Sequence, residues 1–288
     1  MPLSPSETAG EVAVALPEAL GTGSHVQGKS RALAAVQERP RWWLELLTIA
    51  WLAWVYDFIN NLAPLRHSVA IAHALGVLNL EQSLHLTPEL TLNRWLTAHH
   101  TLGAICSDYY DNAHFTVTLG LLGWLWWKRA DIYRPLRTAL VLMNILGLIV
   151  FWLYPVAPPR MLAGFSDVVA DTGAFGSFHS GSLAQAANQY AAMPSLHMAW
   201  AAWCGLVIWQ LSSKPWVRAV AVVYPCLTCV AVLATGNHFL LDVIAGLGTM
   251  ALAVVLVRPV TTAGVAGYYA LHAGVFRSRR GSRVSRPK

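Results

Sequence analysis

The chain has 288 residues, of which 56% are hydrophobic and only 12% are charged, and it contains 13 Trp residues. Apolar segments of about 20 residues recur along it, long enough to cross a bilayer as helices, and they leave little chain for a soluble domain. The net charge of +6 does not indicate nucleic-acid binding, because the basic residues flank apolar segments and gather near the C-terminus. We therefore predict an all-α, polytopic membrane protein whose partner is the lipid bilayer and not a nucleic acid.

Residues 1–38 are rich in Ala, Gly, Ser, Glu and Pro and lack the pattern of a signal peptide. Such a segment buries too little apolar surface to fold, so we expect a disordered cytoplasmic tail. The membrane domain is expected over 39–258. Residues 259–288 are expected to form an interfacial helix and a basic cytoplasmic tail, because a seventh span at 259–276 would place the six following basic residues outside.

Six spans are expected in a helical bundle. Their approximate ranges are 42–62, 102–127, 138–154, 197–211, 217–234 and 239–257. Between the first two spans, leucines alternate with polar residues, which favours an interfacial helical segment that lies on the membrane surface and could form a lid. The third span is expected to follow a basic loop that ends at Arg137, and to stop at the prolines of 155–159, which cannot continue a helix.

The distribution of basic residues predicts the orientation. With six spans, only Arg66, Arg94 and Arg160 fall on one side, and the other seventeen Lys and Arg residues fall on the side of both termini. The positive-inside rule then places both termini in the cytoplasm of an integral plasma-membrane protein. The candidate site described below would face the extracytoplasmic side.

Polar residues lie in the outward halves of the first two spans, where they are costly unless they face a cavity or a substrate. Tyr110 and His114 are four residues apart and share a helix face, so they could contact a substrate head group, with packing as the alternative. Asp57 and Asp111 offer hydrogen-bond partners for the hydroxyl groups of a polyol or a sugar.

Two short motifs in 191–246 carry the strongest signal for chemistry. His238 and Asp242 are four apart at the start of an apolar run, so we expect them on one helix face. The carboxylate would accept the proton of one imidazole nitrogen and leave the other nitrogen free to attack. His197 follows Pro194 and Ser195 at the start of another apolar run, where helix N-terminal amides favour an anion such as phosphate.

These residues form a sufficient set for phosphoryl transfer. A nucleophilic imidazole, a carboxylate that orients it, a second imidazole to protonate the leaving oxygen, and Arg160 to hold the phosphate oxygens supply each required group. Structural roles for the buried ionisable groups, or a zinc site of His197, His238 and Asp242, are the alternatives. The cation at Arg160 favours an anionic ligand over a divalent ion, so we expect neither a metal nor a cofactor.

The motifs resemble those of the type 2 phosphatidic acid phosphatase superfamily, which includes the inositol phosphorylceramide synthases. The resemblance covers about residues 42–257 and is most specific at Pro-Ser-Leu-His 194–197 and at His-Phe-Leu-Leu-Asp 238–242, followed by Gly246. In that family the second-motif His is the general acid, and the third-motif His is the nucleophile of a phosphohistidine intermediate, aided by the Asp. The resemblance implies these roles for His197, His238 and Asp242, respectively.

The sequence departs from the commonest family pattern at two phosphate-binding cations. The Lys six residues before Arg-Pro is missing, and the segment 154–160 stands in its place. Ala231 and Val232 occupy the positions of the usual Ser-Arg. Arg160 is therefore the clear phosphate-binding cation, with Ser195 as a hydroxyl donor. Asn237 either adds an amide donor beside the nucleophile or has a role in the turn.

The resemblance implies a metal-independent enzyme that hydrolyses a membrane lipid phosphate at the extracytoplasmic face. A phosphotransferase of the inositol phosphorylceramide synthase type, in which an alcohol replaces water as acceptor, is the alternative. A transporter or scaffold is a third possibility, but the sequence lacks the paired broken helices of two repeat halves. The lipid tail, the head group, the acceptor and the oligomeric state stay open.

Overall fold

A computed structural model describes residues 39–62, 66–172 and 190–257. Within these ranges the regular structure is helical, and one isolated bridge pairs Val156 with Ala191, which confirms the all-α class. The predicted tail at 1–38 and the predicted interfacial helix and tail at 259–288 lie outside the described residues.

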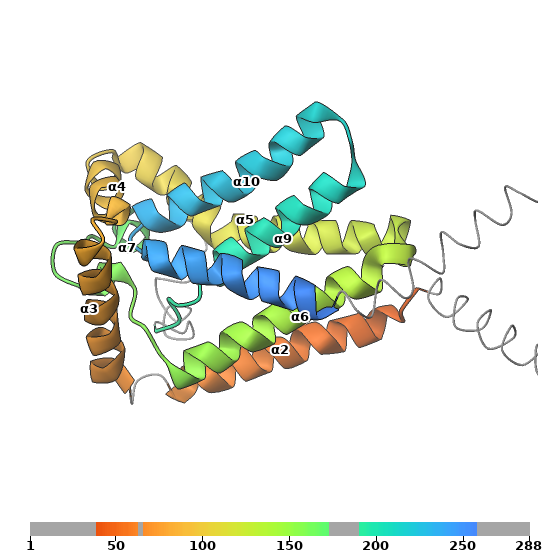
Figure 1. The fold of residues 1–288 in the computed structure, drawn as a ribbon, viewed down its shortest axis with the longest axis horizontal. Coiled ribbons are helices and arrows are strands. Elements are labelled where there is room, and N and C mark those ends of the chain that lie inside the picture. The colour runs from red at the N-terminus through yellow and green to blue at the C-terminus, as the bar shows by residue number, and fades with distance from the viewer. Residues whose placement is uncertain (1–38, 63–65, 173–189, 258–288) are drawn as a thin grey trace, which may run out of the picture.

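Long helices run along one axis of the molecule (Figure 1). They are α2 (Trp42–Leu62), α5 (His100–Lys128), α6 (Ala130–Leu153), α9 (Leu196–Leu211), α10 (Pro215–Ala234) and the helix Leu240–Val257. Each corresponds to one range predicted from the sequence. Among the described residues, α6, α10 and Leu240–Val257 are long and apolar enough to cross a membrane.

The predicted basic loop before the third span is wrong in its extent, because α6 begins at Ala130 and not after Arg137. Asp131 lies in the first turn of α6, where a negative charge is favourable. It also binds Arg129, with 3.0 Å between Arg129 Nε and Asp131 Oδ1. Helical structure therefore resumes directly after Arg129.

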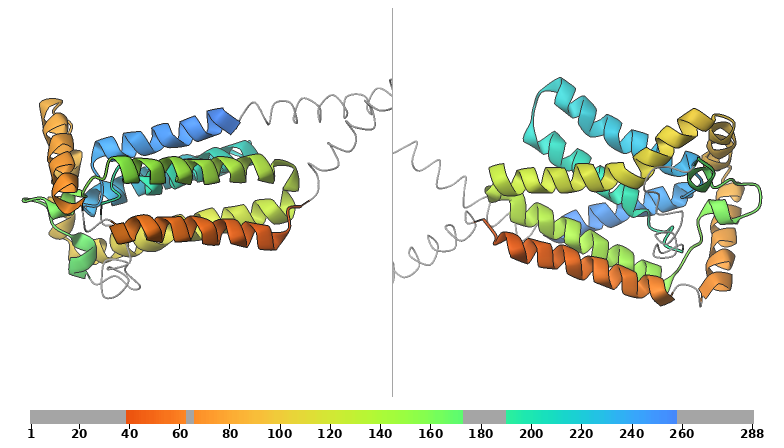
Figure 2. Two further views of the ribbon diagram at one scale, coloured as in Figure 1. Left: turned by 90° about the horizontal axis from the view of Figure 1, so that it is seen from below. Right: turned by 180° about the vertical axis from the view of Figure 1, so that it is seen from behind.

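Two helices, α3 (His67–Ser83) and α4 (Pro88–Thr97), form the segment between α2 and α5. A turn separates them, in which His85 has a φ of 57°. Helix α3 lies across one end of the long helices (Figures 1 and 2). It buries Ala70, Ala74 and Val77 in a cluster that also contains Phe239, just before the helix Leu240–Val257. These two helices are therefore packed onto the end of the bundle.

Asn93 fixes α4 to the rest of this end. Its side chain is fully buried. The amide nitrogen donates to Ser166 O at 3.0 Å and to Ala234 O at 3.1 Å, and the amide oxygen accepts from Ser166 N at 2.8 Å. One side chain thus joins α4, the end of α10 and the loop before α7 (Val168–Thr172).

The bundle core lies between α5, α6 and α9. Its largest side chain is Trp203, which is fully buried and donates from Nε1 to Leu136 O at 3.1 Å. Helices α9 and α10 pack closely because Gly205 lacks a side chain. A Cβ there would lie 2.5 Å from Ala221 O and 2.9 Å from Pro225 Cγ.

The outer faces of the long helices are apolar. Trp42, Trp54, Leu153 and Trp216 each expose more than 60% of their surface. Many large apolar side chains on the long helices are exposed in this way, as is typical of surfaces that contact a membrane or a partner.

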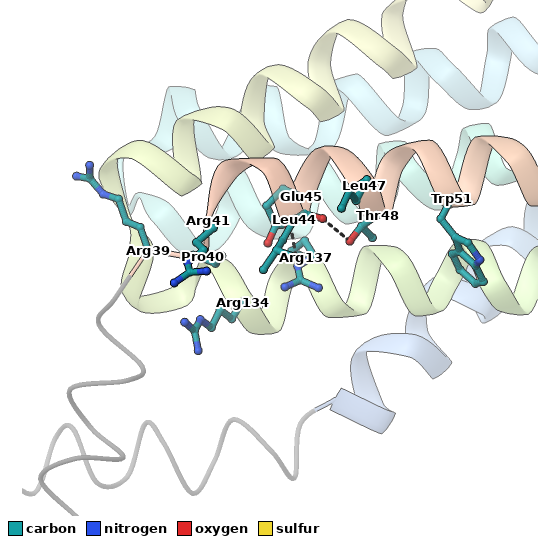
Figure 3. A pocket seen from close by; sticks show the side chains of 10 residues that line it. All are labelled: Arg39, Pro40, Arg41, Leu44, Glu45, Leu47, Thr48, Trp51, Arg134 and Arg137. Atoms are coloured by element: carbon teal, nitrogen blue, oxygen red, sulfur yellow. Dashed lines mark hydrogen bonds and ion pairs between the residues drawn. The ribbon is translucent and has the colours of Figure 1, made fainter.

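The end opposite α3 is basic. A groove between α2 and α6 (Figure 3) is lined by Arg39, Pro40, Arg41, Leu44, Glu45, Leu47, Thr48, Trp51, Arg134 and Arg137. Glu45 Oε2 lies 3.1 Å from Arg137 Nε and accepts from Tyr133 Oη at 2.9 Å, so these contacts join the two helices. Of the described Lys and Arg residues, only Arg66, Arg94 and Arg160 belong to the α3 end.

Candidate active site

His238 lies in the turn after α10, two residues before the helix Leu240–Val257 begins. The expectation that His238 and Asp242 share a helix face is therefore wrong. The chain turns at Gly236, with a φ of 76°, and becomes helical only at Leu240. The turn still brings the two side chains together, with 3.5 Å between His238 Nδ1 and Asp242 Oδ2.

The His238 ring is only 3% exposed, and its two nitrogens differ in their surroundings. Nδ1 lies 2.9 Å from Ala192 O. Because a carbonyl oxygen can only accept, Nδ1 carries a hydrogen, and in the neutral ring Nε2 then has the lone pair. Nε2 is buried and has no hydrogen-bond partner among the described residues. The ring is thus held in the tautomer that a nucleophile requires.

Asp242 combines this contact with a helix cap. Its Oδ2 accepts from Phe239 N at 2.8 Å, as the third residue of a helix does in a capping box. Its backbone oxygen accepts from Ser195 N at 2.9 Å. Asp242 therefore connects the start of its own helix to the loop that precedes α9.

His197 lies in the first turn of α9 and faces both His238 and α5. Its ring centroid is 5.6 Å from that of His238, 4.3 Å from that of Tyr110 and 4.2 Å from that of His114. Ser195 is the N-cap of α9, and its Oγ accepts from Met198 N at 3.3 Å. The Ser195 hydroxyl hydrogen is still able to donate to an anion.

Arg160 reaches the same place from the 3-10 turn Pro159–Met161. Its backbone N–H donates to Gly236 O at 2.8 Å, and its Nη1 donates to Asn237 Oδ1. Its Nε lies 3.1 Å from Asp167 Oδ2. Asn237 in turn donates from Nδ2 to Thr235 Oγ1 at 3.0 Å. These contacts hold the guanidinium against Asn237, the residue that precedes His238 in the sequence.

Asp111 and Asp57 differ in what the structure describes. Asp111 is 2% exposed and follows Tyr110 on α5, so its backbone lies beside the candidate site. Asp57 belongs to α2, but its side chain lies outside the described residues.

The sequence patterns missed several groups at this end of the bundle. Asp167 and the backbone oxygen of Ala192 hold Arg160 and His238, respectively. Glu81 and Glu89 are both fully buried, and Glu81 Oε1 accepts from Leu241 N at 2.7 Å. The only signal for the glutamates was an acidic residue within each of two otherwise leucine-rich stretches.

The two glutamates have shifted pKa values. Burial raises the pKa of Glu81 to about 8, and the charges of Glu89 and Asp242 act in the same direction. Burial likewise raises the pKa of Glu89. Each carboxyl group is therefore more easily protonated than in water.

The arrangement offers a buried imidazole with a free lone pair, a second imidazole opposite it and a fixed guanidinium. Among the described residues, no group of three or more His, Cys, Asp or Glu side chains is arranged to hold a metal ion. These parts suit an anionic substrate that carries an electrophilic centre.

Comparison with known families gives one match. The family model of the PAP2 superfamily matches residues 75–256, which is more than half of the chain. This range includes every candidate site residue named above except Asp57. Comparisons with curated proteins and with solved structures found no significant match.

Proposed function

The chain belongs to the PAP2 superfamily, and from that premise we propose that it is an integral-membrane lipid phosphate phosphatase that works through a phosphohistidine intermediate on His238. The proposal rests on the hydrogen bonding of the two His238 ring nitrogens. Nδ1 is held by Ala192 O beside Asp242, and the buried Nε2 makes no hydrogen bond with a described residue. A neutral imidazole in this tautomer is a nucleophile.

In the first step, His238 Nε2 attacks phosphorus, forming the N–P bond as the ester P–O bond breaks. The ring becomes positively charged, and the Asp242 carboxylate next to Nδ1 stabilises that charge. His197 donates a proton to the leaving oxygen. In the second step, water attacks phosphorus, His197 takes the proton, and the N–P bond breaks to release phosphate and restore His238.

Arg160 would bind the non-bridging phosphate oxygens. A guanidinium has five N–H donors, and Asn237 and Asp167 engage two of its nitrogens. The contacts leave N–H groups for the phosphate and hold the cation in place.

The lipid assignment is supported by the apolar outer faces and the three helices of spanning length. We infer that α2, α5 and α9 also cross the membrane, which gives six spans, and that α3 and α4 lie at the membrane surface. The excess of basic residues at the end opposite α3 favours cytoplasmic termini and an extracytoplasmic site in the plasma membrane.

A lipid phosphotransferase is the second candidate. It is favoured by the buried Asp111 next to Tyr110 on α5, since a carboxylate can hold the hydroxyl of an alcohol acceptor. Hydrolysis needs only water at the phosphohistidine, so we place it first.

The test uses purified protein in detergent and a panel of lipid phosphates labelled in the phosphate group. Wild type should release phosphate, and a rapid quench should trap a protein-bound phosphate that is labile in acid and stable in base. His238→Ala should show neither phosphate release nor a trapped phosphate. His100→Ala, at an exposed position, is the matched control and should show both. A His238→Ala variant that folds and turns over like wild type would refute the proposal. Phosphate release that gives way to a phosphorylated alcohol in excess inositol or glycerol would favour the transferase.

A further inference from the structure

Two buried glutamates approach the start of the helix Leu240–Val257 from the α3–α4 hairpin. Glu81 lies in the last turn of α3 and Glu89 in the first turn of α4. Leu241 N donates to Glu81 Oε1 at 2.7 Å. This amide is one of the first-turn N–H groups that have no partner within a helix. Glu81, which belongs to α3, therefore caps the helix Leu240–Val257 at Leu241, the residue before Asp242.

The two carboxyl groups have little other support. The two side chains interact with each other, and Glu81 Oε2 and both Glu89 oxygens are buried without a hydrogen bond to any other described residue. Within the described ranges, no Lys or Arg forms an ion pair with either glutamate. Arg160 is engaged by Asn237 and Asp167.

Asp242 adds a third buried carboxyl group whose charge acts on both glutamates. Three ionised carboxylates in one buried cluster would repel each other strongly, so at least one takes up a proton. Asp242 keeps the N–H of Phe239 and the imidazole of His238 as partners for its charge. The glutamates have less support: Glu81 has the N–H of Leu241, and neither glutamate has a cation or an imidazole as a partner among the described residues. The glutamates are therefore the groups that take up protons.

A cap for stability alone would not need this arrangement. Ser, Thr, Asp or Asn at the helix start would suffice, and buried carboxyl groups without partners lower stability. Retaining two of them next to Asp242 points to a role in the chemistry of the site.

We propose that Glu81 and Glu89 are positioning residues that each keep a proton at neutral pH, so that Glu81 caps the catalytic helix as a neutral group and Asp242 is the only ionised carboxylate beside His238. This inference rests on the proposed phosphohistidine function. If the pair ionised, its added negative charge would draw a proton onto Asp242, and His238 would lose the carboxylate that stabilises its positive charge.

The shift in pKa gives the direction of the effect. With a pKa of about 8, Glu81 keeps its proton below that pH and loses it above. Activity that depends on the neutral pair should therefore fall as pH rises through about 8. The titratable groups beside the pair are Asp242 and His238. The other titratable or charged groups on the surrounding elements are His73, which is hydrogen-bonded to Pro155 O, the Arg160–Asp167 ion pair, and Arg66, His67, His85, Arg94 and His99 on or beside α3 and α4.

The test compares Glu81→Gln, Glu81→Met and, as matched control, Gln82→Met at the exposed neighbouring position. The substrate is an aryl phosphate with a good leaving group, so that proton donation by His197 does not shape the pH profile. Glu81→Met removes the oxygen that caps Leu241 and should lower kcat roughly 10- to 100-fold at pH 6.5, because small displacements of catalytic groups cost that much. Glu81→Gln keeps the oxygen and should restore most of that loss. Gln82→Met should match wild type.

The pH dependence separates positioning from simple packing. Wild type should lose activity between about pH 7.5 and 9, and Glu81→Gln, which cannot ionise, should lose much less. Glu81→Met should unfold at the same temperature as wild type or higher, since an apolar chain of similar volume replaces a buried carboxyl group. A Glu81→Met variant with wild-type kcat, or a Glu81→Gln variant with an unchanged alkaline loss, would overturn the inference.

A second readout does not require catalysis. The folded-state pKa of Glu81 is raised above its ordinary value of about 4.3, so the folded protein binds a proton that the unfolded chain has released. The Tm of wild type should therefore fall as pH rises from about 5 to 8, and Glu81→Gln should reduce that slope. Equal slopes would refute a protonated Glu81 in the folded protein. If His238→Ala is active, the proposed function fails whatever the slopes show; if it is inactive while Glu81→Met has wild-type kcat, only the positioning role fails.

Discussion

Asp242 serves two neighbours through a single oxygen atom. Its Oδ2 accepts from Phe239 N at 2.8 Å and lies 3.5 Å from His238 Nδ1. The same atom thus caps the helix and lies where it would stabilise a positive charge on the ring. A substitution that preserves one of these two functions can separate them.

Asp242→Asn should keep the cap, because an amide oxygen can accept from Phe239 N, but it removes the negative charge. We expect kcat to fall by roughly 10²- to 10⁴-fold, as when the carboxylate partner of a catalytic histidine is made neutral, with Tm nearly unchanged. Steady-state kinetics and thermal unfolding of the same preparation check this. Wild-type kcat in Asp242→Asn would mean that Ala192 O alone is enough to orient His238.

His197 faces His238 from the side of α5, where it would protonate the leaving oxygen. His197→Ala should therefore lose at least roughly 100-fold in rate with alkyl phosphates, which need a general acid, and much less with activated aryl phosphates. The measurement is the dependence of kcat/KM on the leaving-group pKa, which should become steeper in the variant. An unchanged slope would assign His197 to binding and not to proton transfer.

At the scale of single residues, the sequence pointed to the groups that we propose to react but not to those that hold them. His197, His238 and Asp242 stand in short motifs whose residue types and spacing carry the signal. The partner of His238 Nδ1 is a backbone oxygen 46 positions away, and a backbone group leaves no trace in residue identity. Glu81 looks like any polar residue of a surface helix until packing encloses it.

At the scale of helices, the apolar runs predicted most positions well. The range 42–62 coincides with α2, and the other long helices begin or end within a few residues of their predicted limits, apart from the early start of α6. The surface segment between the first two long helices was predicted as one unit, whereas the turn at His85 divides it. Tertiary contacts at Asn93 fix α4, and no local pattern reports such contacts.

Gly246 allows the helix Leu240–Val257 to pack closely against the start of α9. A Cβ at this position would overlap the carbonyl oxygen of Ser195, whose N–H donates to Asp242 O. Gly246→Ala should push the helix away from this loop, costing about 1–3 kcal/mol of stability, and should lower kcat by separating His197 from His238. Gly248→Ala is the control, because a Cβ there meets nothing within 4 Å and Ala favours helix by up to about 1 kcal/mol. Equal effects of the two substitutions on kcat would contradict this account.

For the whole molecule, the two ends of the bundle differ in charge. Arg66, Arg94 and Arg160 belong to the α3 end, and the remaining described Lys and Arg residues belong to the other. Orientation across a membrane follows such an asymmetry. The sequence supplied this argument without any structure, since it needs only the order of apolar and basic segments.

Single cysteines test the orientation in a background without the native cysteines. Ala170→Cys lies on the exposed side of α7 at the site end, and Ser213→Cys lies in the exposed turn between α9 and α10 at the opposite end. In intact cells, an impermeant thiol reagent should label Ala170→Cys and should reach Ser213→Cys only after lysis. The reverse pattern would place the candidate site on the cytoplasmic side.

The hydrogen bond from Leu241 N to Glu81 Oε1 joins residues 160 positions apart, and this has a consequence for synthesis. The ribosome completes α3 and α4 long before it adds Leu241, so Glu81 lacks this hydrogen-bond donor during most of the synthesis of the chain. His238 and Asp242 are likewise synthesised only at the start of the helix Leu240–Val257. If the chain acts as we propose, a nascent chain that has inserted only its earlier helices cannot cleave the lipids around it, and activity begins only once the helix Leu240–Val257 is in place.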